Sequence, residues 1–370
     1  MRKILVISLA GIGDTLFATP LIHELRANCR DATIDALVMW AGSLVLQGNP
    51  HLNTVHQHNL IHAPKTHSLA FLWKLRGQKY DVSINTHPQS RIHYRIVARI
   101  INARLRISHR YDNSGPFDKL LINRAIEQDY NRHSIDNNLA LLDLIGAKPL
   151  RGHDYEIFLH PSETEWAQQF INAHQLEGRR LFGVHVGSGS TKNLALRRWP
   201  LDRYIELIQK LGREREDINF LLFGGPAEKE DHARFLAQTR GLNILFPETE
   251  NLRQAAALLK KCEFFLSVDT VLMHLAAAMK VPRQFVIETP TWNKPIQPYN
   301  NPFVLVENPA VAGRNLEYYR YDGHGIRGTR NELIRCMESV SVAAVYAKLL
   351  PVLQAAGKLP VAINPIPETN

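Results

Sequence analysis

The sequence contains only three cysteines, Cys29, Cys262 and Cys336, which are far apart and lack the spacing of metal ligands. This scarcity argues against a disulfide framework and against a zinc site, so we expect buried thiols. No apolar run is long enough to cross a bilayer. The short run at 3–9 follows a basic pair, as in a signal peptide, but leads into Gly-Ile-Gly-Asp instead of a small-residue cleavage site. These features predict a soluble, cytoplasmic protein.

The chain has neither low-complexity segments nor short-period repeats, and its composition, 45% apolar and 21% charged, is that of a globular protein. Its 370 residues exceed the roughly 250 to 300 at which a single core stops growing, which predicts two domains. The formal net charge of +9 favours an anionic partner. A nucleotide, an acidic glycan, a membrane surface and nucleic acid all fit that charge.

Apolar, β-branched runs alternate with helical patterns twice along the chain, as in parallel α/β sheets. The runs predicted as strands are 3–9, 33–39, 81–87, 181–188, 218–225, 243–246, 263–269 and 283–288. Helical patterns occupy 14–28 and 90–103, and a last one, at about 333–355, fits against either domain. We place the linker at roughly 160–180. Two such domains predict a ligand between them, beyond the carboxyl ends of the strands.

A glycine turn follows the first predicted strand, in SLAGIGDTLFATP. Gly11 and Gly13 allow a substrate to approach the backbone closely. Phe17 stands where a dinucleotide fingerprint needs its third glycine, so an NAD-dependent oxidoreductase is poorly supported. Asp14 is a candidate general base, because a helix N-terminus keeps it ionised and able to accept a proton from an attacking hydroxyl. The alternative is that Asp14 only caps the helix.

Two segments that follow strands in the second half suit a nucleotide. In VHVGSGSTKNLALRRWP, Ser188 offers a hydroxyl while Lys192 and Arg197 offer cations for a pyrophosphate. A basic surface loop is the alternative. In LLFGGPAEKE, Gly224 and Gly225 permit close approach of a base or ribose, although this pattern is also a common connection between a strand and a helix.

A third segment, FFLSVDTVLMHLAAAMKVP, combines a strand end with a helix start. Asp269 and Thr270 open the helix, whose free N–H groups and positive dipole end suit a phosphate. His274 lies one turn along the same helix as Thr270. A capped structural helix with a histidine in the core is the alternative.

Together these segments resemble glycosyltransferase family 9, the heptosyltransferases that transfer heptose from ADP-heptose during lipopolysaccharide core assembly. The resemblance extends along most of the chain and is carried by KILVISLAGIGDTLFATPLIHELR, GSGS...RRWPLDRYIELI, FGGPAEKE, SVDTVLMHLAAAMKVP and CMESVSVAAVYAKL. It implies an α/β fold of GT-B architecture, with two Rossmann-like doubly wound domains facing across a cleft. On this basis we expect an acceptor-binding domain at 1–170, a nucleotide-sugar-binding domain at 171–332, and a helix and tail at 333–370 that could pack back on the first domain.

The resemblance also implies roles for the candidate residues. Transfer would invert the anomeric carbon without an obligatory metal or any other cofactor, and Asp14 would be the catalytic base. Arg197, at a position that is often lysine in the family, would hold the departing diphosphate together with Thr270, and Lys192 would assist. Ser188, Asp269 and His274 complete the expected diphosphate site.

The chain departs from the family at two places near the expected donor pocket. Val271 brings a branched side chain where glycine is usual. The segment IETPTWNKP, in place of the usual FGPT, brings Glu288 and Trp292. These departures leave open a transfer from another sugar nucleotide, or a non-catalytic protein that binds a sugar nucleotide or glycan.

A basic face is predicted on the first domain, where Arg91, Arg95 and Arg99 recur at helical spacing. With Gly11 and Gly13, it would bind an anionic glycan or glycolipid acceptor, and it suits a position at the inner face of the cytoplasmic membrane. A merely solvated helix face is the alternative. Nucleic acid is a poorer partner, because no aromatic platform alternates with the arginines and no known binding motif is present.

Overall fold

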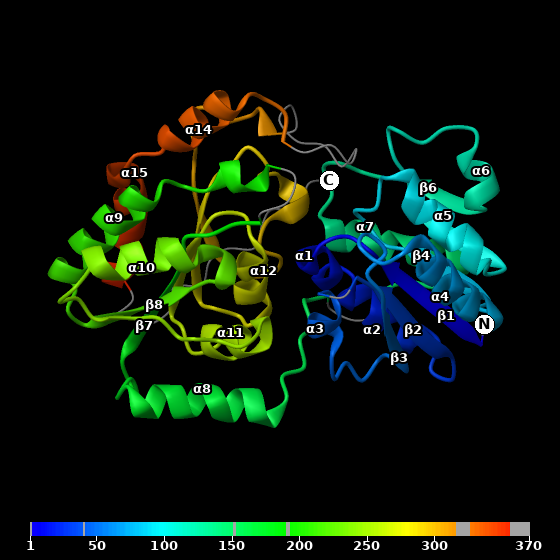
Figure 1. Ribbon diagram of the computed structural model, residues 1–370, viewed down its shortest axis with the longest axis horizontal. Helices are drawn as coiled ribbons and strands as arrows, with labels where there is room; N and C mark the ends of the chain where they lie inside the picture. The colour runs from blue at the N-terminus through cyan, green and yellow to red at the C-terminus, as the bar shows by residue number, and fades with distance from the viewer. Residues whose placement is uncertain (1, 40, 151–152, 190–192, 316–325, 356–370) are drawn as a thin grey trace.

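The computed structural model describes residues 2–39, 41–150, 153–189, 193–315 and 326–355. They form two α/β domains that lie side by side (Figure 1). Each domain is built on a parallel six-stranded sheet.

The first sheet has the strand order β3-β2-β1-β4-β5-β6, in which the order reverses between β1 and β4. Its strands are β1 (Lys3–Ser8), β2 (Thr33–Val38), β3 (Thr54–Gln57), β4 (Val82–Asn85), β5 (Leu105–Arg110) and β6 (Arg124–Glu127). The central β1 is almost wholly buried, as expected of a parallel strand covered by helices on both faces. The covering elements are α1 (Ile12–Leu16), α2 (Thr19–Asn28), α3 (Ser43–Leu46), α4 (Lys65–Gly77), α5 (Ile92–Ile101), α6 (Asp118–Leu121), α7 (Ser134–Ala140) and η1 (Leu141–Ile145).

The helix predicted at 14–28 is two helices instead of one. Helix α1 ends at Leu16, and α2 begins at Thr19 with Pro20 in its first turn. Proline is tolerated there because the first N–H groups of a helix have no partner within the helix. The break shortens α1 to a single turn directly after the glycine turn.

The second sheet repeats the topology of the first, with the order β12-β11-β10-β7-β8-β9. Its strands are β7 (Arg180–His185), β8 (Ile218–Phe223), β9 (Ile244–Leu245), β10 (Phe264–Ser267), β11 (Arg283–Ile287) and β12 (Phe303–Val306). The helical elements are α8 (Pro161–Ala173), η2 (Leu194–Arg197), α9 (Leu201–Glu214), η3 (Pro226–Glu228), α10 (Lys229–Gln238), α11 (Leu252–Leu259), α12 (Val271–Ala278), η4 (Lys294–Ile296), α14 (Arg330–Glu338) and α15 (Val342–Ala355).

Two segments near the domain boundaries differ from the sequence-based expectation. The stretch expected as a linker contains α8, which packs against α11 of the second domain. The helical pattern at 333–355 is broken between α14 and α15. Helix α15 packs on α9, β11 and β12 and not on the first domain, with Val345 and Leu349 buried in the second core. No single described helix is long and apolar enough to cross a membrane. Helices α14 and α15 together have the length and apolar composition of a membrane span, but they are bent by 43° relative to each other.

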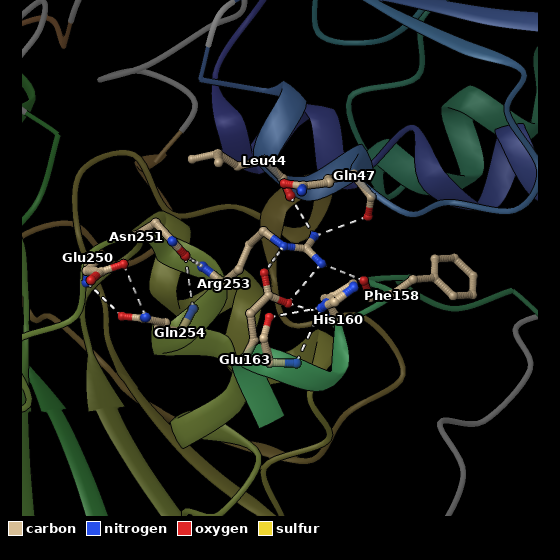
Figure 2. Close-up of polar contacts among 10 residues, drawn as sticks. Leu44, Gln47, Phe158, His160, Glu163, Glu250, Asn251, Arg253 and Gln254 are labelled. Atoms are coloured by element: carbon tan, nitrogen blue, oxygen red, sulfur yellow. Dashed lines mark hydrogen bonds and ion pairs between the residues drawn. The ribbon is translucent and has the colours of Figure 1, made fainter. Parts of the chain in front are cut away.

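A buried arginine joins the two domains. The Arg253 guanidinium, on α11, donates to the backbone oxygens of Leu44 (2.8 Å) and Gln47 (3.2 Å) in the first domain, as Figure 2 shows. It also donates to the Phe158 oxygen (2.6 Å) on the segment before α8 and pairs with Glu163 (2.5 Å). Because Arg253 is only 3% exposed, these contacts satisfy a cation that water does not reach. A second junction, between α1 and α12, contains the candidate site.

Candidate functional site

The glycine turn places Asp14 at the start of α1. The Gly11 N–H donates to Asp14 Oδ2 at 2.7 Å, so the side chain does cap the helix. Capping does not conflict with a role as base, because a carboxylate has about four acceptor positions and this bond uses one. Asp14 is half-buried at the end of β1, where ligands of doubly wound sheets bind.

His274 brings the second domain against this turn. A Cβ added to Gly13 would lie 2.9 Å from His274 Cδ2, so only glycine lets the imidazole come this close. Phe17 meets the same ring edge to face, with centroids 4.9 Å apart, and the Tyr155 hydroxyl lies 3.3 Å from His274 Nδ1. Burial lowers the pKa of His274 to about 4, and nearby Asp269 opposes this shift. The histidine is therefore neutral at physiological pH.

Asp269 connects His274 to Arg197. One carboxylate oxygen, Oδ1, lies 3.9 Å from His274 Nε2, and the other accepts from Arg197 at 2.8 Å. The Thr291 hydroxyl donates to the same oxygen at 2.8 Å and accepts from Arg197 at 3.3 Å. The buried Arg197 Nε has no hydrogen-bond partner among the described residues. The guanidinium is thus oriented by Asp269 and keeps a donor for a further acceptor.

Thr270 is the N-cap of α12 and is nearly fully buried. Its hydroxyl makes no capping bond and lies 3.2 Å from His185 Nδ1, at the end of β7. Burial lowers the pKa of His185 to about 3, so this second histidine is also neutral. The structure therefore brings Asp14, Thr270, Asp269, His274 and Arg197 to one junction between the domains.

Comparison with known proteins shows the family of the chain. The family profile described as "Glycosyltransferase family 9 (heptosyltransferase)" matches residues 68–318, which is more than half of the chain. The chain belongs to glycosyltransferase family 9. Among curated proteins, it is 24% identical to lipopolysaccharide heptosyltransferase 3 of Escherichia coli over 280 residues, 73% of this chain and 78% of that protein. It is 22% identical to the lipopolysaccharide core heptosyltransferase OpsX of Haemophilus influenzae, with 81% and 82% covered.

Solved structures confirm the GT-B fold of this family 9 protein. The glycosyltransferase family 9 structure from Veillonella parvula has a TM-score of 0.75 at 19% identity, covering 95% of this chain and 97% of that chain. The E. coli ADP-heptose lipopolysaccharide heptosyltransferase II has a TM-score of 0.68 at 19% identity, with 96% and 100% covered. At these identities the likeness concerns the fold.

The loop after β7 does not bring all of its predicted diphosphate-binding residues to the domain junction. Ser188 donates to the Leu194 oxygen (3.1 Å) and accepts from Arg198 (3.2 Å), so its hydroxyl holds the loop together. Arg198 in turn pairs with Glu228 and Asp231 at 3.2 and 3.1 Å. Lys192 lies outside the described residues. Of the two described arginines in this loop, Arg197 is the one that reaches Asp269 at the domain junction.

The glycine pair after β8 accommodates the protein's own side chains. A Cβ on Gly224 would lie 2.3 Å from His232 Nε2, and the Gly225 N–H donates to Glu228 at 2.9 Å. The contact with His232 explains Gly224 without a nucleotide, whereas a Cβ on Gly225 would meet Glu228 only at an ordinary 3.7 Å. These contacts leave the proposed contact with a nucleoside as a prediction.

The predicted basic face is wrong at its central residue. Arg95 is 2% exposed and pairs with Asp118, because the inner side of α5 packs against α6. Arg99 is exposed and donates to Asn102, whereas Arg91 occupies the N-cap position of α5 without a side-chain capping bond and is half-exposed. Gln89, two residues before Arg91, accepts from the N–H of Leu9 at 3.3 Å, so the segment that leads into α5 lies against the one that leads into the glycine turn.

The segment IETPTWNKP, one of the two departures from the family, packs into the core of the second domain. Glu288 is buried and accepts from the Asn308 N–H at 2.7 Å. Trp292 packs edge to face on Phe303 instead of lining an open pocket. Thr291, from the same segment, is the residue that reaches Arg197 and Asp269, and the sequence analysis missed it. The sequence feature that could have indicated Thr291 is its position after β11, because the carboxyl end of that strand lies at the same sheet edge as Asp269.

A separate cluster offers ligands of the metal-binding type. His23, His51 and Glu156 have potential ligand atoms within 4.8 Å of one another. The His23 Nδ1 lies 2.5 Å from Glu156 Oε1, which is the distance of a direct hydrogen bond and leaves no space for an ion between the two atoms. We interpret the cluster as an ion pair that ties α2 to the segment before α8.

Proposed function

We propose that this family 9 glycosyltransferase transfers a heptose from ADP-heptose to a hydroxyl of a lipopolysaccharide core acceptor, with inversion at the anomeric carbon. The observation that carries the proposal is the junction of α1 and α12. It brings the glycine turn that carries Asp14 against His274 of the second domain, and His274 is linked through Asp269 to the Arg197 guanidinium. A base on one side and a cation on the other are what an inverting displacement needs.

Asp14 acts as the general base in this proposal. The acceptor oxygen attacks the anomeric carbon and gives its proton to the Asp14 carboxylate, while the bond from that carbon to the diphosphate oxygen breaks. The capping bond to Gly11 fixes the carboxylate without using its full acceptor capacity. The profile match begins after Asp14, so this assignment depends on the glycine turn and on the geometry.

Arg197 and the start of α12 receive the negative charge of the departing diphosphate. Arg197 offers its Nε–H, and the first turn of α12 offers N–H groups and its positive dipole end. Asp269 carries the same sign of charge as a phosphate, so we assign it the orientation of Arg197 instead of direct binding. Because these groups supply the positive charge, we propose that transfer proceeds without a metal ion.

The acceptor lies on the first domain in this proposal, between Asp14 and the beginning of α5. Arg91 occupies the N-cap position of that helix and gives the acceptor side a cation. A lipopolysaccharide acceptor is anionic and anchored in a membrane, which would place the protein on the cytoplasmic side of that membrane. Arg99 is exposed on the same helix and is available for a second contact.

The test compares Asp14→Asn with the wild type, using ADP-heptose and a core acceptor. We expect the rate of transfer to fall by about a hundredfold or more, as for loss of a general base, while donor binding is retained. Glu332→Gln is the control, because Glu332 likewise accepts from the N–H of the N-cap residue of its own helix, Thr329, at 3.4 Å. The anomeric configuration of the product, read by NMR, tests inversion.

The same assay separates the alternatives. Near-normal turnover of Asp14→Asn would remove Asp14 from catalysis. Binding of the donor by the wild type without transfer would identify a non-catalytic protein. A thermal-shift panel of nucleotide sugars in which ADP-heptose gives no shift, and another donor does, would reassign the sugar.

A further inference from the structure

Large apolar side chains are exposed almost exclusively on one part of the first domain. Among the described residues, those exposed by more than a third are Ile61, Leu69, Trp73, Ile92, Ile96, Phe117, Leu120 and Leu150. All except Leu150 lie between residues 61 and 120. Helix α4 contacts α5, and α5 contacts α6, so the three helices form a continuous surface along one edge of that domain (Figure 1).

We name this surface the α4–α6 face and define it by Leu69, Trp73, Ile92, Ile96, Phe117 and Leu120. Its members are too exposed to belong to the core: Trp73 is 57%, Phe117 59% and Leu120 62% exposed. Scattered apolar residues are normal on protein surfaces, but a gathering of this kind marks an interaction site.

Helix α5 carries apolar residues on its exposed side. Arg95 is buried against Asp118, in a helix whose buried side also contains Val97, Ala98 and Ile101, whereas Ile92 and Ile96, one turn apart, are 45% and 39% exposed alongside Arg99. In a surface helix the apolar stripe faces the core and the charges face the solvent. The outer side of α5 therefore suits an environment less polar than water.

Positive charge is concentrated in the same part of the chain. Residues 61–124 contain twelve Lys and Arg against three Asp and no Glu, a net charge of +9 that equals the formal net charge of the whole protein. Asp118, one of the three acids, is neutralised by Arg95. Lys65, Lys74 and Lys119 are exposed on α4 and α6, among the apolar residues.

We propose that the α4–α6 face docks on the surface of a bilayer that contains anionic lipid. Lys and Arg near such a surface contribute about 1 kcal/mol each, and aromatic and aliphatic side chains insert at the headgroup level. A second copy of the chain is a poorer partner for the α4–α6 face, because a symmetric dimer contact would set two positively charged faces against each other. The proposal rests on the proposed function in one respect, which is that the acceptor is anchored in a membrane.

The position of α5 connects this surface with the site. The helix follows Arg91 and contains Ile92 and Ile96, and Gln89, just before it, accepts from the N–H of Leu9 (3.3 Å), just before the glycine turn of Asp14. A glycan attached to a lipid in the same bilayer would thus approach the first domain from the side that carries the candidate base. Docking would deliver the acceptor by confining its search to the membrane plane.

The experiment measures sedimentation of the full chain with vesicles of phosphatidylcholine, with and without about one-third phosphatidylglycerol. We expect binding to the anionic vesicles that weakens as salt rises, because the Debye length falls from about 10 Å at 0.1 M to about 3 Å at 1 M. The variant Leu69→Ser/Trp73→Ser/Ile96→Ser should bind at least tenfold more weakly. Leu150→Ser is the matched control, because it removes an exposed leucine outside the face.

Three outcomes would overturn the proposal. They are absence of binding to anionic vesicles, equal binding by the triple variant, and a wild-type dimer in solution that the triple variant dissociates. Circular dichroism verifies folding, and the single variant Ile96→Ser replaces the triple one if that fails to fold. Transfer to a soluble, delipidated acceptor should be the same in the wild type and the triple variant. Vesicle binding without any transfer would refute the proposed function and leave the docking surface standing.

Discussion

Removal of Arg197 should weaken the binding of ADP far more than that of adenosine. In the protein the guanidinium is held by Asp269 at 2.8 Å, with its side chain 12% exposed. A charge-assisted hydrogen bond from such a group contributes about 1.5 to 3 kcal/mol, which corresponds to a factor of about 10 to 150 in affinity. Adenosine lacks the charge that Arg197 contacts, so its affinity should change by less than about twofold.

The ion pair adds a second effect to this variant. Arg197→Ala removes the guanidinium from the buried Asp269 carboxylate, which keeps its hydrogen bond from Thr291 and lies beside the proposed diphosphate site. Two like charges repel by about 4 kcal/mol at 4 Å for an effective dielectric constant of 20. Arg197→Ala should therefore lose at least a hundredfold in affinity for ADP, and Arg197→Ala/Asp269→Asn should recover about tenfold of that loss.

Isothermal titration calorimetry with ADP and adenosine measures both effects. Arg180→Ala is the control, because Arg180 is also paired with acids but lies at the amino end of β7. Equal losses for ADP and adenosine would show a packing defect instead of lost phosphate binding. If the double variant binds ADP more weakly than Arg197→Ala, Asp269 contributes to binding directly, and the role that we assign to it is wrong.

Three further predictions concern the domain junctions and pH. Gly13→Ala should lower the rate of transfer at least tenfold, because its Cβ would lie 2.9 Å from the facing histidine ring, whereas Gly77→Ala has open space and should not change it. Arg253→Met breaks a buried ion pair and should destabilise the protein to urea by about 3 to 5 kcal/mol, against less than about 1 kcal/mol for the exposed Arg234→Met. Burial lowers the pKa of His109 to about 4, below the value of about 6.5 in the unfolded chain. Between these two values the folded state binds fewer protons than the unfolded state, so the free energy of unfolding should fall as the pH decreases from about 6.5 to 4. His109→Gln should reduce that slope by up to about 1.4 kcal/mol per pH unit; an unchanged slope would contradict this assignment.

The central strands could be predicted from sequence because parallel strands are buried on both faces. β1 and β10 read as apolar runs for that reason, and both were found within about two residues. Strands β3, β5, β6 and β12 were missed. The edge strands β3 and β6 are half-solvated and carry polar residues such as those of Thr54–Gln57, and the interior β5 has an exposed, basic end at Arg110. The apolar β12 was missed for no such reason, and the edge strand β9 was found. The strand order follows from pairing between distant segments, which local patterns do not contain.

The candidate site could be located from sequence, but its internal contacts could not. Asp14 and Thr270 were found because both follow a strand and open a helix, which places them at the same edge of their sheets. That Asp269 would hold Arg197 depends on an approach of two loops separated by 72 residues. The error at Arg95 has a local cause, since regular spacing of arginines shows which residues share a side of a helix but not which side faces water.

The location of the chain's net charge also bears on how the molecules behave when they are detached in solution. The +9 of residues 61–124 belongs to the part of the chain that also exposes the apolar side chains, which would otherwise favour association between copies. At low ionic strength this charge keeps the molecules apart, as net charge does for colloidal particles. Salt at about 1 M shortens the screening length to about 3 Å and removes that repulsion while leaving the apolar contact intact. Solubility of the purified protein is therefore expected to decrease, not increase, as salt is added.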